Sequence, residues 1–164
     1  MVIINKKGIA TGLDINAEAL EIANLTLKEN NFQAKLINAD FKTYVSDEKY
    51  DVIVSNPPYF DTKDDRKKNQ NYHLKIARHE EYLPLKNLCE SFKKNLNENG
   101  NIYLVYRPSR LNELEKNLNE NNLFINHFQF VYDYRKSEAK SVLVHASFKN
   151  TNKIQLENKI IGDW

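Results

Sequence analysis

Blocks of apolar residues separated by polar ones predict the elements of the first third of the chain. Residues 9–15 form a short apolar run that ends in an acid, and 34–38 and 50–55 are two more such runs. Runs that are nearly continuous in apolar residues are typical of parallel strands buried on both faces. Between the first two runs, apolar residues recur at helical spacing over 17–29, with Asn16 placed as the N-cap.

The second half of the chain repeats these two periodicities. Residues 80–97 and 109–121 each carry one apolar face and predict helices, the first of them ending at Asn99 and Gly100 as a C-cap. Further strands are predicted at 102–106, 124–134 and 141–148. The order of elements predicts an α/β sheet that is mostly parallel, with an antiparallel hairpin at its C-terminal end.

Two polar regions interrupt these patterns. The segment 61–78 has no apolar periodicity, and a loop of that length in a compact domain is usually functional or disordered. Its cations are interleaved with acids, so a solvated loop and an RNA contact are equally supported. The second region is the predicted hairpin end, for which RNA stacking is the less favoured interpretation. It contains Tyr132, Tyr134, Arg135 and Lys136.

Composition and charge restrict the function classes. The 164 residues suit one domain, and 24 Lys and Arg against 22 Asp and Glu give a net charge of +2, too small to indicate nucleic-acid binding by bulk charge. The single Cys89 excludes an intramolecular disulfide and a Cys-rich metal site, and we interpret it as a small core residue. Residues 1–7 form neither a signal peptide nor a membrane span, so we expect a cytoplasmic protein.

The tetrad Asn56-Pro57-Pro58-Tyr59 directly follows the predicted strand 50–55. In open α/β sheets, ligands bind beyond the carboxyl ends of strands. The Asn56 amide oxygen and the Pro57 carbonyl are two acceptors for an exocyclic amine, and Tyr59 offers a flat face for a planar ring. Two acceptors on one amine draw its nitrogen out of conjugation and expose the lone pair to an electrophile. The alternative is a Pro-Pro turn with a surface Tyr.

Two acids end the preceding strands in the same way. Asp14 ends the first predicted strand and Asp40 follows the second. A carboxylate at such a place is the usual partner of a ribose hydroxyl in nucleotide-binding sheets. Taken singly, Asp14 is equally explained as part of a helix cap and Asp40 as a turn residue. Three polar side chains at three successive strand ends, counting Asn56, favour a site.

These residues resemble a known family. The segments Gly12-Leu13-Asp14-Ile15, Asn38-Ala39-Asp40-Phe41 and Asn56-Pro57-Pro58-Tyr59-Phe60 are similar to class I S-adenosylmethionine-dependent methyltransferases that modify exocyclic amines. With Ala77-Arg78-His79-Glu80, the chain resembles the bacterial tRNA1(Val) (adenine(37)-N6)-methyltransferase family over about residues 8–149. The resemblance implies a Rossmann-like three-layer sandwich, S-adenosylmethionine as cofactor, tRNA as partner, and no metal or membrane.

The resemblance also implies roles for individual residues. Asn56, Pro57, Pro58 and Tyr59 would be catalytic. The cofactor would be bound by Asp14, Ile15, Asp40, Phe41 and Asn56, with the ribose on Asp14 and the adenine on Asp40 and Phe41. Substrate contacts would come from Tyr59, Phe60, Lys67, Lys68, Arg78 and His79. For the last two, capping and pairing at a helix start is an equally supported alternative.

The family pattern starts with a strand, a Gly-rich turn and a helix. We find no counterpart of this unit in the sequence. The chain has 4 Gly, none in such a turn. We interpret 1–7 as the last turn of that helix, so the central strand would be absent and its neighbours would have unpaired inner edges. We therefore expect a truncated methyltransferase domain at 1–150 and a linker-like tail at 151–164 that does not end on a packed element.

Three functions follow from this interpretation. The first is N6 methylation of a tRNA adenine, impaired in this chain and completed by an upstream or separate polypeptide that supplies the missing segment. The second is methylation of a protein glutamine or of another nucleic-acid amine. The third is a non-catalytic RNA-binding remnant of the fold.

Overall fold

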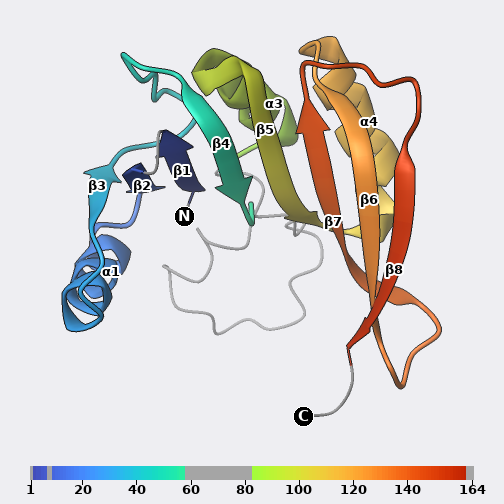
Figure 1. Cartoon of the computed structure of the whole chain (residues 1–164), viewed down its shortest axis with the longest axis horizontal. Helices are drawn as coiled ribbons and strands as arrows, with labels where there is room; N and C mark the ends of the chain where they lie inside the picture. Colours follow the sequence, from blue (N-terminus) through green and yellow to red (C-terminus); the bar gives the residue numbers. More distant parts are fainter. Residues whose placement is uncertain (1, 7–8, 58–82, 162–164) are drawn as a thin grey trace.

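The computed structural model describes residues 2–6, 9–57 and 83–161, which form one eight-stranded sheet flanked by helices (Figure 1). The strands are β1 Val2–Lys6, β2 Ile9–Asp14, β3 Ala34–Asn38, β4 Tyr50–Ser55, β5 Leu96–Tyr106, β6 Phe124–Asp133, β7 Ala139–Ser147 and β8 Gln155–Ile161. The helices are α1 Ala17–Glu29, α3 Leu85–Asn95, the 3-10 turn η3 Pro108–Arg110 and α4 Leu111–Glu120.

The strands lie in the order β3-β2-β1-β4-β5-β7-β6-β8. The pairings make β2, β3, β4, β5, β6 and β8 run in one direction, with β1 and β7 against them. The predicted α/β sheet, mostly parallel and with an antiparallel β6–β7 hairpin, is confirmed. The connections β2-α1-β3 and β4-α3-β5 proceed in opposite directions along the sheet. Since such crossovers are right-handed, α1 and α3 belong to opposite faces.

The place of the central strand is filled, which corrects the prediction for 1–7. Strand β1 lies between β2 and β4 and is antiparallel to both, with Val2 paired to Leu13 on one side and to Ser55 on the other. The interpretation of this segment as a last helical turn is wrong, and so is the expectation of unpaired inner edges. The reason is that the edges of β2 and β4 need backbone partners, and the β-branched run Val-Ile-Ile is well suited to a strand.

Local signals explain the first helix. The side-chain oxygen of Asn16 accepts from the backbone N–H groups of Glu18 at 3.0 Å and Ala19 at 3.4 Å, which confirms the predicted N-cap. The helix ends before Asn31, which has a positive φ of 55°. Within α1 only Leu20 is buried, so the helix covers one margin of the sheet and contributes little to the core.

Most of the core lies between the sheet and the α3–α4 pair, which pack beside one another (Figure 1). The helices supply Leu88, Phe92, Leu114 and Leu118, and the sheet supplies Ile53, Ile102, Leu104, Val142 and Val144. Cys89 is fully buried among them, as its interpretation as a core residue requires. Among the described helices, none combines the length and apolar composition needed to cross a bilayer.

The C-terminal boundary predicted for α3 is wrong. The helix ends at Asn95, and Leu96 already has extended backbone, with φ −86° and ψ 137°. Gly100 therefore lies inside β5 and does not cap a helix. The side chain of Asn95 bonds to the segment at Tyr44 and Ser46, so its contacts are tertiary and the chain turns into the sheet directly.

The end of the chain also differs from the prediction. Residues Gln155–Ile161 form β8, which pairs in parallel with β6 from His127 to Asp133. The interpretation of this stretch as linker-like is wrong, because its backbone hydrogen bonds extend the sheet by one strand. Its side chains are all exposed, so the sequence pattern carries no burial signal for it.

Candidate functional site

Three sequence-predicted strand ends lie at one edge of the sheet. Because β2, β3 and β4 run in the same direction, Asp14, Asp40 and Asn56 all emerge at their common carboxyl edge. One strand, β1, separates β2 from β4, and two strand spacings place Asp14 and Asn56 on the order of 10 Å apart. The sheet reverses its order of connection here, which is where ligands bind in open α/β sheets.

Asp14 is the last residue of β2 and is half-buried. Its Oδ1 accepts the backbone N–H of Asn16 at 2.9 Å, and its carbonyl accepts the N–H of Ala39 at 3.1 Å. The carboxylate is thus oriented by the turn that starts α1. Ile15 follows it and is exposed at the same edge.

A residue without a predicted role, Asn38, ties the two strand ends together. Its side-chain N–H group donates to the carbonyl of Asp14 at 3.1 Å and to the carbonyl of Ile15 at 3.0 Å. In the sequence, the signal for this role is an Asn at the end of a predicted strand, two residues before Asp40. By fixing the spacing of β2 and β3 beyond the last ladder pair, Asn38 positions Asp14 against Asp40.

Asp40 lies in a tight turn after β3. Its Oδ1 accepts the backbone N–H of Lys42 at 2.9 Å, and its Oδ2 lies 3.3 Å from the Lys42 ammonium. Its carbonyl accepts the N–H of Tyr44 at 2.9 Å. Phe41 points away from this edge into the core, where it is 4% exposed and its ring centroid is 5.7 Å from that of Phe92.

Asn56 and Pro57 follow β4 directly. The side chain of Asn56 is exposed, whereas Pro57 is buried and fixes the backbone at this point. The other predicted site residues lie outside the described residues: Pro58, Tyr59, Phe60, Lys67, Lys68, Arg78 and His79. The structure therefore brings together Asp14, Ile15, Asp40 and Asn56 and directs the Phe41 ring elsewhere.

The described residues suit the nucleoside part of a nucleotide-like cofactor. Carboxylates on two adjacent strand ends are acceptors for ribose hydroxyls and for a ring amine, and exposed Ile15 offers an apolar contact. Gly12 lies within β2 and is paired on both sides, and Gly100 lies within β5. Among the described residues, no Gly-rich turn therefore cradles the remaining part of such a cofactor at this edge.

Comparison with known proteins identifies the family. Residues 2–133 match the methyltransferase small domain family. The chain is 28% identical over 152 residues to a tRNA1(Val) (adenine(37)-N6)-methyltransferase of Flavobacteriaceae bacterium strain 3519-10, covering 92% of the chain and 62% of that protein. It is 37% identical over 100 residues to a release factor glutamine methyltransferase of Streptococcus pneumoniae, covering 57% of the chain and 36% of that protein.

Solved structures agree on the fold. A ribosomal protein L11 methylase from Lactobacillus delbrueckii subsp. bulgaricus has a TM-score of 0.60 at 20% identity, covering 85% of this chain and 57% of that one. A methyltransferase from Pyrococcus furiosus has a TM-score of 0.59 at 20% identity, covering 85% and 62%. The chain thus spans about three fifths of the length of the tRNA1(Val) methyltransferase and of these two structures, and just over a third of the length of the release factor glutamine methyltransferase.

The matched segment contains all three strand ends of the site and strands β1 to β4, which align them. The resemblance found in the sequence is confirmed, and with it S-adenosylmethionine as the cofactor of the family. The chain belongs to the methyltransferase small domain family.

Proposed function

We propose that this chain carries the acceptor half of an S-adenosylmethionine-dependent methyltransferase that modifies the N6 amine of an adenine in tRNA, with adenosine 37 of a valine tRNA as the target. The observation that carries the proposal is the common edge at which Asp14 ends β2, Asp40 lies in the turn after β3 and Asn56 follows β4, because these three strands run in the same direction. The tRNA1(Val) methyltransferases among the relatives support the choice of substrate.

Asn56 and Pro57 would hold the target amine. The exposed Asn56 amide oxygen accepts one N–H and the backbone carbonyl of Pro57 accepts the other, so the amine nitrogen pyramidalises and its lone pair points away from the ring. The Pro57 ring fixes its φ, and the following Pro58 restricts the ψ of Pro57 to extended values, so the direction of the Pro57 carbonyl is limited before the substrate binds. This nitrogen would form a bond to the methyl carbon as the bond between that carbon and the cofactor's sulfonium sulfur breaks, with the electron pair of the broken bond staying on sulfur. The methylated amine would then give one proton to solvent.

S-adenosylmethionine would supply an electrophilic methyl group. In the proposal, Asp14 accepts from the ribose hydroxyls, Asp40 accepts from the adenine amine, and Ile15 packs against the nucleoside. Since the Phe41 ring packs on Phe92 in the core, Phe41 would contribute through its backbone. Because the described residues lack a Gly-rich cradle for the methionine part, we expect weak cofactor binding and slow turnover by this chain alone.

The substrate side of the proposal rests on the resemblance. Pro58 would continue the rigid segment, and Tyr59 would stack on the target base together with Phe60. Lys67, Lys68, Arg78 and His79 would contact tRNA phosphates. A loop adenine is only partly stacked, so its extraction costs less than flipping from a duplex. A tRNA substrate also fits a cytoplasmic location.

Transfer of a radiolabelled methyl group tests the proposal. The chain is offered an unmodified valine tRNA transcript, the same transcript with guanosine at position 37, and a release-factor peptide containing glutamine. We expect slow incorporation into the first substrate only, abolished by Asn56→Ala and retained in Asn119→Ala, an exposed Asn on α4. Incorporation into the peptide instead would support the glutamine alternative. Incorporation no greater than that of Asn56→Ala with every substrate would contradict catalysis by this chain.

A further inference from the structure

The β6–β7 hairpin projects past the edge that carries the candidate site. Following the register across the sheet, Ser55 at the end of β4 is level with Leu104, Val144 and Phe128 on β5, β7 and β6. Strand β6 then continues for five more residues to Asp133. At about 3.3 Å per residue, the hairpin extends on the order of 16 Å beyond the end of β4 before it turns.

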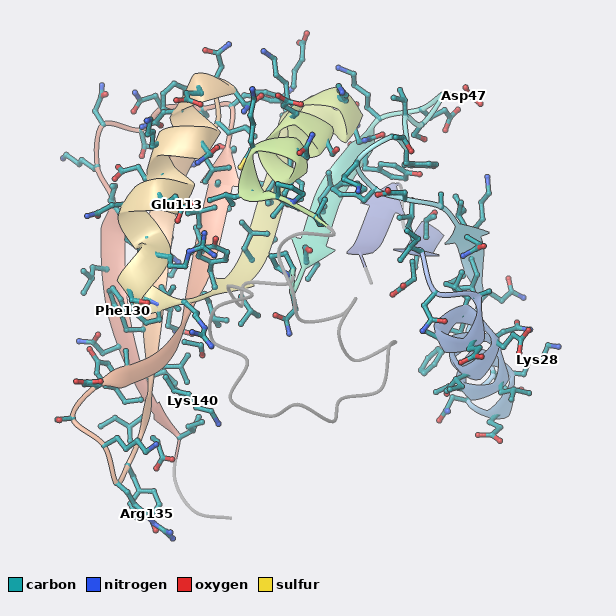
Figure 2. All side chains as sticks on the ribbon, turned by 180° about the vertical axis from the view of Figure 1, so that it is seen from behind. Lys28, Asp47, Glu113, Phe130, Arg135 and Lys140 are labelled. Atoms are coloured by element: carbon teal, nitrogen blue, oxygen red, sulfur yellow. The ribbon has the colours of Figure 1, made fainter. Side chains whose placement is uncertain are left out.

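The hairpin projects on the side of the sheet where the candidate site lies. Strand β6 runs parallel to β4 in the sheet, so its carboxyl end and the hairpin tip lie on the side where Asn56 emerges. Three strand spacings separate β4 from β6, about 14 Å sideways. The tip is therefore on the order of 20 Å from Asn56, too far for the target base and suited to neighbouring nucleotides. Figure 2 shows Arg135 at the outer end of this hairpin and Lys140 nearer the sheet.

The tip presents an aromatic ring and cations together. Tyr134 is 48% exposed, and the Arg135 guanidinium lies over its ring at 4.8 Å from the centroid, with its Nε donating to the Tyr134 hydroxyl. Lys136 follows them in the turn and Lys140 lies at the start of β7, and both are exposed. This pairing of a flat ring with guanidinium and ammonium groups matches the chemistry of single-stranded RNA, which offers base faces and phosphates.

The tip is preformed. Its turn is closed by the Lys136 N–H donating to the Asp133 carbonyl at 2.9 Å and by the Arg135 N–H donating to the Asp133 Oδ1 at 3.1 Å. The Tyr134 N–H donates to the Ile161 carbonyl at 3.3 Å, so β8 braces the turn from the side. The Asp133 carboxylate accepts one of the hydrogen bonds that close the turn. Because the backbone of the tip is already ordered, binding there costs little backbone conformational entropy.

We propose that the hairpin tip, defined as Tyr134, Arg135, Lys136 and Lys140, is an RNA-contacting arm that holds the tRNA several nucleotides away from the target base. This inference rests on the proposed function, because only a macromolecular substrate bound at Asn56 would also reach the tip. Arg135, Lys136 and Lys140 contact phosphates, and Tyr134 stacks on an unpaired base. The arm thus adds affinity and orientation without touching the reacting atoms.

Binding of the valine tRNA transcript, measured by fluorescence anisotropy from 50 to 300 mM salt, tests the arm. The double variant Arg135→Ala/Lys136→Ala should raise the Kd about tenfold at 0.1 M salt and reduce the slope of log K against log salt by about 1.5 to 2. Tyr134→Ala should raise the Kd about fivefold or more, and Tyr134→Phe should restore it. The matched control is Lys93→Ala/Lys94→Ala in the last turn of α3, at the opposite edge of the sheet.

The outcomes separate the arm from the function. Equal Kd values and salt slopes in the arm and control variants, together with Asn56-dependent methylation of tRNA, would overturn the arm and leave the proposed function intact. Methylation of the release-factor peptide without tRNA binding would overturn both. All variants should keep the thermal unfolding midpoint of the parent, since the substituted side chains are exposed.

Discussion

The side-chain oxygen of Asn95 accepts a hydrogen bond from the backbone N–H of Ser46, at 2.8 Å and across 49 residues of sequence. The same side chain donates to the carbonyl of Tyr44 at 3.0 Å and to that of Ser91 at 2.9 Å, and it is fully buried. The end of α3 therefore holds the segment that leads on from Asp40. The buried side-chain amide of Asn95 thus supports the turn at Asp40, where the adenine of the cofactor is proposed to bind.

Replacement of the Asn95 side chain should lower the stability of the fold. Asn95→Ala leaves the partly buried Ser46 N–H and Tyr44 carbonyl without their partner, so we expect a loss of about 1–3 kcal/mol in the free energy of unfolding. Urea denaturation followed by circular dichroism measures it. Asn119→Ala, exposed on α4, should change it by less than about 0.5 kcal/mol. Equal stability of the two variants would contradict the assigned role of Asn95.

Gly100 offers a second test, because it is required by close packing. A Cβ added there would lie 2.7 Å from Cδ1 and 2.8 Å from Cγ of Leu96, and 3.0 Å from the carbonyl oxygen of Asn97. Leu96 is fully buried and cannot swing aside. Gly100→Ala should therefore destabilise the protein by about 1–3 kcal/mol, as overpacking does. Thermal unfolding should place Asn99→Ala, the exposed neighbour, close to the parent, and an unchanged midpoint for Gly100→Ala would show that the strand can shift.

The buried Cys89 thiol should be unreactive in the native protein. Burial, with the nearby carboxylates of Glu120 and Glu90, raises the pKa of its thiol to about 12. The thiolate, which is the reactive form, is therefore nearly absent at neutral pH. We expect no reaction with Ellman's reagent at pH 8 in native conditions and one reactive thiol in 6 M guanidinium. Rapid native labelling would mean that α3 opens locally.

The elements with strong periodicity were predictable from the sequence, and those defined by pairing alone were not. The helix at 17–29 and the β6–β7 hairpin follow from spacing and caps. Strand β1 was misinterpreted because a short Val-Ile-Ile run has no helical or strand period, and only its neighbours' unpaired edges decide its state. Strand β8 exposes every side chain, so its existence depends on backbone bonds to β6 that no burial pattern records.

The site was predictable to a similar degree. Carboxyl ends of parallel strands must meet, so Asp14, Asp40 and Asn56 could be placed together from their positions after three apolar runs. The direction of the Phe41 ring could not be predicted, because it depends on packing against Phe92. Phe92 lies on α3, 51 positions later in the chain. The role of Asn38 requires two carbonyls from another strand end, which only the folded chain brings within reach.

His145 lies on the open face of the sheet, away from α3 and α4. Its ring stacks on Tyr103 with centroids 5.0 Å apart, and its Nε2 lies 2.8 Å from Oδ1 of Asn101. The face around it forms a shallow cavity of about 260 Å³. His127 from β6 also lines this cavity, and its Nε2 is 3.5 Å from the Glu157 carboxylate. Burial, and then the positive charge of His127, lower the pKa of His145 below its usual 6.5.

This lowered pKa predicts a loss of stability in mild acid. The unfolded chain binds the His145 proton near pH 6.5, whereas the folded protein binds it only at lower pH, so protonation favours unfolding. The contribution of His145 is complete above pH 6.5 and is lost as the pH falls from there through the folded pKa. His145→Gln keeps a donor for Asn101 and cannot titrate, so its free energy of unfolding should vary less between pH 7.5 and 5 than that of the parent. His127→Gln removes this neighbouring charge together with the 3.5 Å contact to the Glu157 carboxylate, and its slope should lie between those of the parent and of His145→Gln. Urea denaturation at several pH values measures all three proteins, and a His145→Gln slope as steep as that of the parent would assign the acid sensitivity to other groups.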